Sequence, residues 1–179
     1  MKFHGVINLF NKRLDFLKYI KIFATGGTFD KEYNEINGKL YFKDTQIFDL
    51  LKLGRSQLNV KIETLMMIDS LKMSSEDRDY IVNKCKQENT NRIIITHGTD
   101  TMIETAKFIA TQVKNKTIIL TGAMIPIKFG SSDGLFNLGS ALSFIQVIKP
   151  GVYLTMNGRY FKFNNVYKNK KLGIFEKIK

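Results

Sequence analysis

The feature that most constrains the fold of this chain is an alternation of short apolar runs with stretches of helical pattern. The apolar runs are rich in β-branched residues, and each ends in glycine or polar residues. The alternation predicts strands over residues 21–24, 60–68, 92–96, 117–121 and 152–156, and helices over residues 46–53, 75–85, 102–113 and 135–147. Strands that alternate with helices form a mostly parallel sheet with helices on both faces. The sequence therefore predicts an α/β doubly wound fold, a flavodoxin-like or Rossmann-like three-layer sandwich.

This fold class predicts where a ligand would bind. In such sheets the ligand lies beyond the carboxyl ends of the strands, at the point where the strand order reverses. If the order is 2-1-3-4-5, the first and third predicted strands are neighbours at that point. Thr28 follows the first strand, and Thr99 and Asp100 follow the third, so we expect them to face one crevice. Ser70, in the loop after the second strand, would flank it.

The length of the chain and the absence of repeats or linkers indicate a single domain. A chain of 179 residues with 44% hydrophobic composition can bury one core, and it contains no internal repeat or domain linker. We assign residues 20–179 to this domain and residues 1–19 to an N-terminal extension whose structure the sequence does not decide. Asn37 and Gly38 lie between apolar residues, a pattern that predicts a hairpin over residues 32–42. This hairpin would form a flap after the first strand.

Cysteine usage and hydropathy indicate a reducing, aqueous compartment. Cys85 is the only cysteine, so no intrachain disulfide can form, and Cys and His show no metal-ligand spacing. No apolar run reaches the ~18 residues that a membrane-spanning helix requires. Residues 1–10 also lack the pattern of a secretory signal. We therefore expect a cytoplasmic protein that binds neither a metal nor a membrane.

The net charge of +12 raises the question of nucleic-acid binding, because Lys and Arg neutralise phosphates. The basic residues are spread along the chain, however, whereas a phosphate-binding surface usually shows as a cluster or a stripe. The local enrichment is in the tail, where Glu176 faces Arg159, Lys162, Lys168, Lys170, Lys171, Lys177 and Lys179. We interpret most of these side chains as solvated surface and expect no nucleic-acid partner.

Hydroxyl, carboxylate and lysine side chains provide the candidate chemistry. A hydroxyl nucleophile needs a base to take its proton and donors for the oxyanion. Thr28 follows Gly26 and Gly27, whose lack of side chains lets backbone N–H groups approach a substrate carbonyl; alternatively, the two glycines only make a tight turn. Thr99 beside Asp100 could pair with a lysine to activate water or a threonine. Asp100 could instead cap the following helix.

Two motifs resemble other kinds of site and do not fit them. Residues 130–134 match G-x-S-x-G, but that mechanism needs a histidine after Ser132, and His4 and His97 both precede it. Ser132 or Asp133 is instead expected to cap a helix. The glycine turn after the first strand lacks the Lys-Ser/Thr ending of a P-loop and the three-glycine spacing of a dinucleotide site.

Several motifs occur in register with the predicted strand ends. They are Ala24-Thr25-Gly26-Gly27-Thr28, Ile68-Asp69-Ser70, Thr96-His97-Gly98-Thr99-Asp100-Thr101-Met102, Thr121-Gly122-Ala123-Met124 and Asp133-Gly134-Leu135-Phe136-Asn137-Leu138. From about Lys21 to Glu176, the chain resembles the amino-terminal, active-site-bearing domain of the bacterial L-asparaginase and glutaminase family. Met156-Asn157-Gly158-Arg159 and Val166-Tyr167-Lys168-Asn169 resemble the segment that carries the family's catalytic lysine.

The resemblance implies amide hydrolysis in two stages, without a metal or an organic cofactor. Thr28 would be the nucleophile that forms the acyl-enzyme. Thr99, Asp100 and Lys168 would form the group that activates the hydroxyl or the water, with the division of labour between the two threonines left open. A lysine that acts as a base in such a relay requires burial or a neighbouring cation.

The resemblance also implies a set of substrate contacts. Ser70 would bind the α-carboxylate of the substrate, and Asp100 would hold its α-ammonium. Tyr33 is the choice for the flap tyrosine that supports the nucleophile, with Tyr41 as the alternative. The expected substrate-binding residues are Gly27, Tyr33, Asp69, Ser70 and Gly98, of which the glycines would offer backbone amides.

Two functions remain open on the sequence. Family members carry a second, carboxy-terminal domain, and a neighbouring subunit's second domain contributes an acidic group to the active site, so a homo-oligomer is implied. We expect an amidohydrolase that releases ammonia from L-asparagine or a related small amide. The alternative is a catalytically weak or inactive amino-acid-binding or regulatory module that has lost the second domain.

Overall fold

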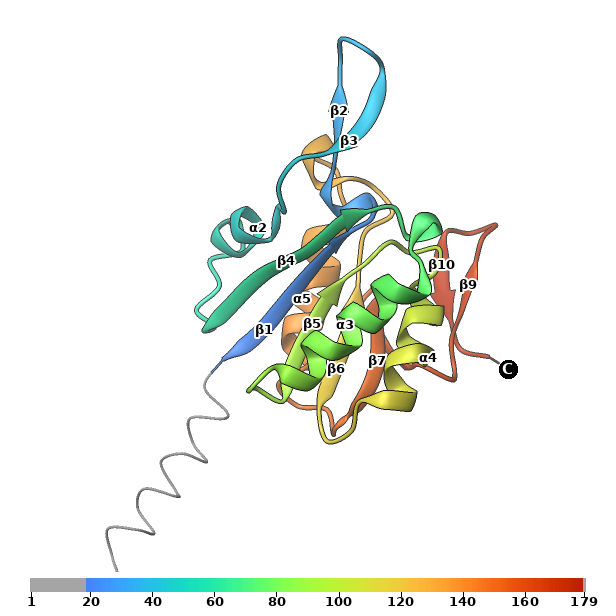
Figure 1. The fold of residues 1–179 in the computed structure, drawn as a ribbon. Helices are drawn as coiled ribbons and strands as arrows, with labels where there is room; N and C mark the ends of the chain where they lie inside the picture. The colour runs from blue at the N-terminus through green and yellow to red at the C-terminus, as the bar shows by residue number, and fades with distance from the viewer. Residues whose placement is uncertain (1–18, 179) are drawn as a thin grey trace, which may run out of the picture.

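A six-stranded sheet forms the centre of the computed structural model, which describes residues 19–178 (Figure 1). Its strands are β1 (Ile20–Gly26), β4 (Val60–Ile68), β5 (Arg92–Thr96), β6 (Thr117–Thr121), β7 (Gly151–Met156) and β8 (Arg159–Lys162). Their order is β4-β1-β5-β6-β7-β8, and all neighbours are parallel except β7 and β8. The five parallel strands follow the order 2-1-3-4-5, so the predicted fold class is confirmed and the strand order on which the site prediction depended is the one observed.

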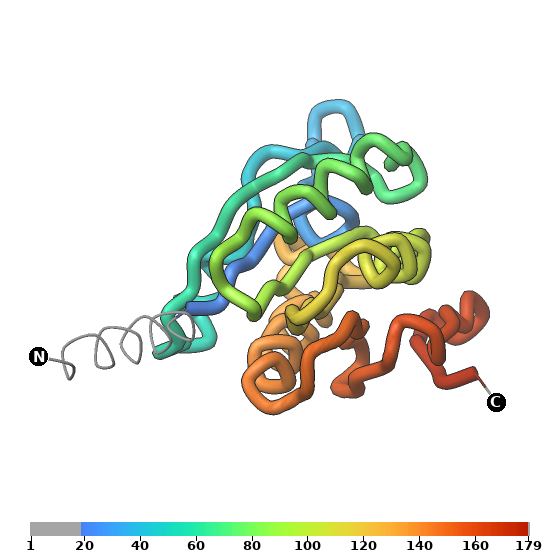
Figure 2. Tube along the Cα trace, turned by 60° about the horizontal axis from the view of Figure 1, so that its bottom comes forward, coloured from blue at the N-terminus to red at the C-terminus, as the bar shows by residue number. Residues whose placement is uncertain are grey.

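Helices cover both faces of this sheet. In Figure 1, α3 (Ser75–Gln87) and α4 (Met102–Gln112) lie in front of the sheet and α5 (Gly134–Phe144) lies behind it. Residues of β1 alternate between the layers: Phe23 packs in the core with α3 and α4, whereas Ile22 packs with α2 (Ile47–Leu53) and α5. Figure 2 shows the red C-terminal segment at the opposite edge from the teal β4. The fold is therefore the predicted three-layer sandwich.

Hairpins extend the sheet at its carboxyl end and at its edge. β2 (Lys31–Asn34) and β3 (Lys39–Phe42) form the predicted flap, which projects beyond the sheet (Figure 1). β7 continues into β8 through Asn157 and Gly158, both at positive φ as a type I′ turn requires. β9 (Tyr167–Asn169) pairs with β10 (Ile174–Glu176) as a separate antiparallel hairpin. The sequence patterns did not predict β8, β9 or β10.

Short 3₁₀ helices begin the loops that leave the carboxyl ends of the parallel strands. η1 (Thr28–Asp30) follows β1, η2 (Ser70–Lys72) follows β4, and η3 (Ile127–Phe129) lies in the loop after β6. These tight turns keep Thr28 and Ser70 close to the strands that precede them. The carboxyl edge of the sheet is therefore where the candidate chemistry gathers.

The predicted N-terminal extension falls outside the described residues except for Tyr19. The Tyr19 hydroxyl donates a hydrogen bond to the Glu88 carboxylate, and the Lys61 ammonium lies 4.1 Å from the centroid of its ring. Tyr19 is thus packed against the sheet. Within residues 19–178, no helix has the length and apolar character that crossing a membrane would require.

Candidate active site

Segments that follow β1, β5 and β4 touch one another at the carboxyl edge of the sheet. A Cβ on Gly27, which follows β1, would lie 2.4 Å from both the N and the Cα of Gly98. A Cβ on Gly98, which follows β5, would lie 2.5 Å from the Oγ of Ser70. Only glycine permits backbones to approach this closely. The strand order thus brings Gly27, Gly98 and Ser70 into contact.

Thr28 directly follows Gly27 and is the first residue of η1. Its side chain is partly buried, and its hydroxyl makes no hydrogen bond with any residue in the described part of the chain. The preceding peptide is held in place because Gly27 N–H donates to the Ile68 carbonyl at 2.9 Å. The Thr28 hydroxyl is therefore positioned by its backbone and available to a ligand.

Lys168 joins Thr99 and Asp100 although almost seventy positions separate them in the sequence. Its Nζ donates to Thr99 Oγ1 and to Asp100 Oδ1, both at 2.8 Å. Thr99 is buried and the Lys168 side chain is 11% exposed, while the Asp100 side chain is 43% exposed. The three side chains form one hydrogen-bonded group that opens to solvent at Asp100. The N-cap of α4 is Thr101, without a side-chain capping bond, so the capping alternative for Asp100 is wrong.

A buried network holds the hairpin that carries Lys168. Lys168 on β9 pairs with Phe175 on β10, and the buried Phe175 ring joins the core formed with α3 and α4. Phe175 N–H donates to Asn157 Oδ1 at 3.0 Å, and Asn157 N–H donates to Asn137 Oδ1 at 3.0 Å. Asn137 is buried and donates to the Gly122 carbonyl as well. Asn137 and Asn157, to which the sequence patterns assigned no role, therefore help to orient Lys168.

Asp69 and Ser70 form the loop on the far side of Gly98. The Asp69 carboxylate accepts hydrogen bonds from Lys31 Nζ at 2.6 Å and from Leu71 N–H at 3.0 Å, and these two donors lower its pKa. Ser70 is buried, and its carbonyl accepts a hydrogen bond from Thr101 Oγ1 at 2.9 Å. Lys31 is the first residue of the flap, so the ion pair fastens the flap to the loop that contains Ser70. The sequence patterns gave Lys31 no role.

His97 lies behind the candidate site as a neutral, buried side chain. Its Nδ1 lies 2.8 Å from the Gly98 carbonyl oxygen, and its Nε2 lies 3.2 Å from the Met73 sulfur. Burial lowers the pKa of His97 to about 4. The imidazole is therefore uncharged at neutral pH, and its contacts indicate that it supports the backbone at Gly98.

The flap tyrosines lie away from Thr28. Tyr33 is 52% exposed, and its hydroxyl lies 3.9 Å from the place that a Cβ on Gly38 would take in the hairpin turn. The Tyr41 hydroxyl donates to the Glu32 carboxylate at 3.1 Å. Neither hydroxyl is hydrogen-bonded to Thr28 within the described residues. In this conformation the described contacts of both tyrosine hydroxyls are with other residues of the flap.

Asp30 joins the two ends of the flap. Its Oδ1 accepts hydrogen bonds from Thr45 Oγ1 and Gln46 N–H, both at 3.0 Å, while its buried Oδ2 has no hydrogen-bond partner among the described residues. Burial raises the pKa of Asp30 to about 6, and the hydrogen bonds from Gln46 and Thr45 oppose this effect only in part. The root of the flap thus contains a carboxyl group that titrates close to neutral pH.

We expect the stability gained by Asp30→Asn to grow as the pH rises from about 4 to about 7. The carboxyl of Asp30 has a pKa of about 6 in the folded protein against an ordinary value of 3.8. Its contribution is present below the ordinary value and is lost as the pH rises through the folded value. The change corresponds to at most about 3 kcal/mol in the free energy of unfolding. Urea unfolding of both proteins at several pH values tests this, and a difference independent of pH would contradict it.

The residues of the G-x-S-x-G stretch shape a loop. Ser132 Oγ accepts a hydrogen bond from Gly134 N–H at 2.9 Å, at the start of α5. Asp133 occupies the N-cap position, but its carboxylate accepts from Met124 N–H at 2.9 Å and from Asn137 Nδ2 at 2.9 Å. Both side chains therefore hold the start of α5 against the loop after β6. Over residues 19–178, no group of three His, Cys, Asp or Glu side chains is placed to hold a metal ion.

Comparison with known sequences identifies relatives that are longer than this chain. The family described as "Asparaginase, N-terminal" matches residues 19–176. The L-asparaginase of Thermococcus kodakarensis is 31% identical over 159 residues, which cover 86% of this chain and 48% of that protein. The glutaminase-asparaginase of Acinetobacter glutaminasificans is 34% identical over 128 residues, which cover 69% and 38%. The chain thus spans about half the length, or less, of these curated relatives.

Solved structures show the same relationship in three dimensions. The thermostable L-asparaginase of Thermococcus kodakarensis superposes with a TM-score of 0.75 at 30% identity, over 89% of this chain and 51% of that one. A probable cytoplasmic L-asparaginase from Campylobacter jejuni superposes with a TM-score of 0.76 at 28% identity, over 89% and 53%. The similarity extends over nearly all of this chain and about half of each of those structures.

Proposed function

The chain belongs to the asparaginase family, and from this membership we propose that it is an amidohydrolase that releases ammonia from L-asparagine or a related small amide. The observation that carries the proposal is the hydrogen-bonded group of Thr99, Asp100 and Lys168. This group lies beside the contact of Gly27 with Gly98, from which Thr28 also departs. A free hydroxyl, a proton-transfer group and close backbone amides are what acyl transfer requires.

In the first stage, Thr28 acts as the nucleophile. Its oxygen attacks the carbonyl carbon of the amide, and backbone N–H groups near Gly27 and Gly98 stabilise the oxyanion that forms. The proton that Thr28 loses passes to the leaving nitrogen, so the C–N bond breaks and ammonia departs. An ester between the substrate's acyl group and Thr28 remains.

In the second stage, water hydrolyses this ester. The group of Thr99, Asp100 and Lys168 takes a proton from the attacking water, which adds to the acyl carbon. The bond to Thr28 then breaks, Thr28 regains a proton, and the acid product leaves. General acid–base assistance of this kind accelerates a step by about 10²- to 10⁴-fold.

The substrate contacts that we propose are those implied by the family resemblance. We assign Ser70 to the α-carboxylate and Asp100 to the α-ammonium, since Asp100 is the exposed member of its group. Asp69 is already paired with Lys31, which supports a role in holding the Ser70 loop. Tyr33 would contact the substrate or Thr28 only after the flap moves over the site.

The alternative is an amino-acid-binding or regulatory module with little or no activity. This alternative predicts tight binding of an amino acid without turnover. The complete Thr99–Asp100–Lys168 group favours the enzyme, since a module that only binds has no need of it.

We also propose that the protein acts as a cytoplasmic homo-oligomer, with a small amide as its ligand and neither nucleic acid nor membrane as a partner. Exposed apolar side chains on α2 and α5, among them Phe48, Leu53 and Phe136, support association. Sedimentation of the purified protein measures the oligomeric state directly.

Ammonia release by the purified protein tests the proposed function. We expect release from asparagine, glutamine or another small amide, loss of that release in Thr28→Ala, and partial retention in Thr28→Ser, which keeps a hydroxyl group. The removal of a nucleophile should lower kcat by about 10³-fold or more. No release from any amide, together with measurable binding of an amino acid, would favour the regulatory module instead.

A further inference from the structure

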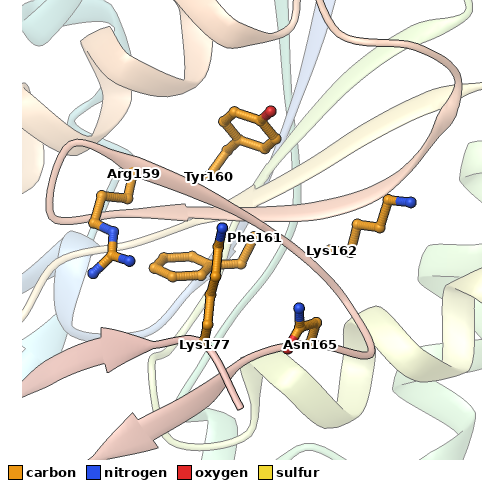
Figure 3. Close-up of a pocket in the computed structure, with 6 residues that line it drawn as sticks. All are labelled: Arg159, Tyr160, Phe161, Lys162, Asn165 and Lys177. Atoms are coloured by element: carbon orange, nitrogen blue, oxygen red, sulfur yellow. The ribbon is translucent and has the colours of Figure 1, made fainter. Parts of the chain in front are cut away.

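A hollow of about 510 Å³ lies between β8 and the chain that follows β10 (Figure 3). Its lining residues are Arg159, Tyr160, Phe161, Lys162, Asn165 and Lys177. β8 is the last strand in the sheet order, at the opposite end from β4. None of the residues proposed for amide hydrolysis lines this pocket. It is therefore a site that the proposed function does not use.

The lining carries three cations and no carboxylate. Arg159, Lys162 and Lys177 form no ion pair or hydrogen bond through their side chains with other residues of the described chain. The neighbouring Glu176 carboxylate accepts hydrogen bonds from Tyr167 and Asn169. Unpaired like charges that surround one concave space create a positive potential there and favour an anion. Arg159 and Lys177 lie on the same side of β8 as the Phe161 ring, and they are the two cations that face the hollow together (Figure 3).

The shape of the pocket adds to the effect of its charge. The Arg159 guanidinium lies over the buried Phe161 ring, 5.2 Å from the centroid, which limits the orientations of the guanidinium. Figure 3 shows Lys177 rising beside Phe161 while Tyr160 points to the other side of β8. A planar guanidinium binds two oxygens of a phosphate at once, and ammonium groups add point charges. The volume is larger than a single phosphate needs and falls in the range of small-molecule sites.

From this arrangement we propose that the pocket binds the phosphate group of a small molecule, as a phosphomonoester or a diphosphate. Arg159 supplies the paired donors, Lys177 neutralises charge beside it, and Asn165 offers a further polar contact, while Lys162 lies with Tyr160 on the other face of β8 and adds only to the general positive potential. The remaining volume accommodates the organic part of the ligand. On this proposal, the basic residues of the tail that line the pocket bind a specific ligand, while the other basic residues of the tail are solvated.

The pocket is connected to the hairpin that carries Lys168. Lys177 directly follows β10, and Phe175 on β10 is fastened to Asn157, next to the start of β8. A ligand that holds Lys177 against β8 therefore also restrains β10 and its partner β9. Binding should slow the exchange of amide hydrogens in residues 167–177.

Calorimetric titration of the full chain with pyrophosphate tests the proposal. At about 0.15 M ionic strength we expect a dissociation constant of about 1 mM or lower. Arg159→Gln and Lys177→Gln should each weaken binding about tenfold, the usual effect of a charge-assisted hydrogen bond. The matched controls are Arg55→Gln and Lys107→Gln, exposed residues outside the pocket, which should leave binding unchanged. All four side chains are exposed, so folding is retained in each variant.

Three results would overturn the proposal. The first is equal weakening by the pocket variants and the controls, because binding would then report net charge alone. The second is binding of citrate as tight as that of pyrophosphate, because the site would then not select phosphate. The third is tight retention of a single-stranded oligonucleotide that pyrophosphate does not displace, which would indicate a nucleic-acid surface. Slower amide exchange in residues 167–177 with pyrophosphate, seen in wild type and not in Arg159→Gln, supports the proposal independently of any enzymatic activity.

Discussion

Lys168→Met should lower the rate of ammonia release by about 10²- to 10⁴-fold, the range expected for loss of a proton-transfer group. Lys168 Nζ donates to both Thr99 and Asp100, so methionine removes the cation and both hydrogen bonds while it keeps most of the side-chain volume. Because the substrate would bind mainly through Ser70 and Asp100, we expect kcat to fall more than KM rises. Steady-state assays of both proteins over a range of pH measure this separation.

The control for this variant is Lys170→Met, two positions further along the chain. Lys170 is exposed and makes no hydrogen bond with any described residue, so its loss removes the same charge at a place without chemistry. We expect Lys170→Met to match the wild type in both kcat and thermal stability. If Lys168→Met also kept its full rate, the proposed proton-transfer group would be wrong, and the search for a base would move to other side chains near Thr28.

The fold class was predictable from the sequence because strands that alternate with helices form a mostly parallel sheet by general packing rules, whereas the strand order entered only as a condition. β1, β5, β6 and β7 are short apolar runs that are almost entirely buried, whereas β4, at the edge of the sheet, is longer and only partly buried. The general rule for such sheets then placed the candidate site at the carboxyl ends of the strands. Gly27 and Gly98 then identify the two strands that meet there.

The hairpins show the limit of such patterns. Asn37 with Gly38 predicted the flap, whereas the same dipeptide at Asn157 and Gly158 makes the turn into β8 and was not recognised as a hairpin signal. In the second case the turn follows a fully buried strand, and only Phe161 of β8 is buried, so the alternation is short. β9 and β10 contain three residues each, fewer than a periodic pattern needs.

Contacts between distant segments account for the remaining part of the candidate site. Lys168 was found through its resemblance to a family motif, because no spacing links it to Asp100. Lys31 and Asn157 gave no local signal, since each acts on a residue at least 18 positions away: Lys31 on Asp69, and Asn157 on Phe175. Asp30 lies just before the predicted flap and was assigned no role, because its burial depends on how the root of the flap packs. Such roles require a three-dimensional structure.

Gly27→Ala should unfold the carboxyl edge of the sheet or destabilise the whole protein by about 3 kcal/mol or more. The new Cβ would lie 2.4 Å from backbone atoms of Gly98, which cannot move aside as a flexible side chain would. The residue also has φ +73° and ψ −170°, a region essentially restricted to glycine, which costs alanine roughly 1–3 kcal/mol. Overpacking adds about 1–3 kcal/mol. Denaturant unfolding of the variant and the wild type measures the difference.

Gly139→Ala is the matched control, since it is the same substitution at a glycine in the exposed part of α5. A Cβ at Gly139 meets no atom within 4 Å, so alanine should stabilise the protein by about 0.5–1 kcal/mol. If Gly27→Ala lowers the free energy of unfolding and Gly139→Ala raises it, the loss at Gly27 is due to the close approach of the Gly98 backbone and not to the replacement of a glycine as such. A Gly27→Ala protein with wild-type stability would mean that β1 and β5 do not meet as closely as described. Thr28 and the Thr99 group would then lack a common site, and the proposed hydrolysis would lose its structural basis.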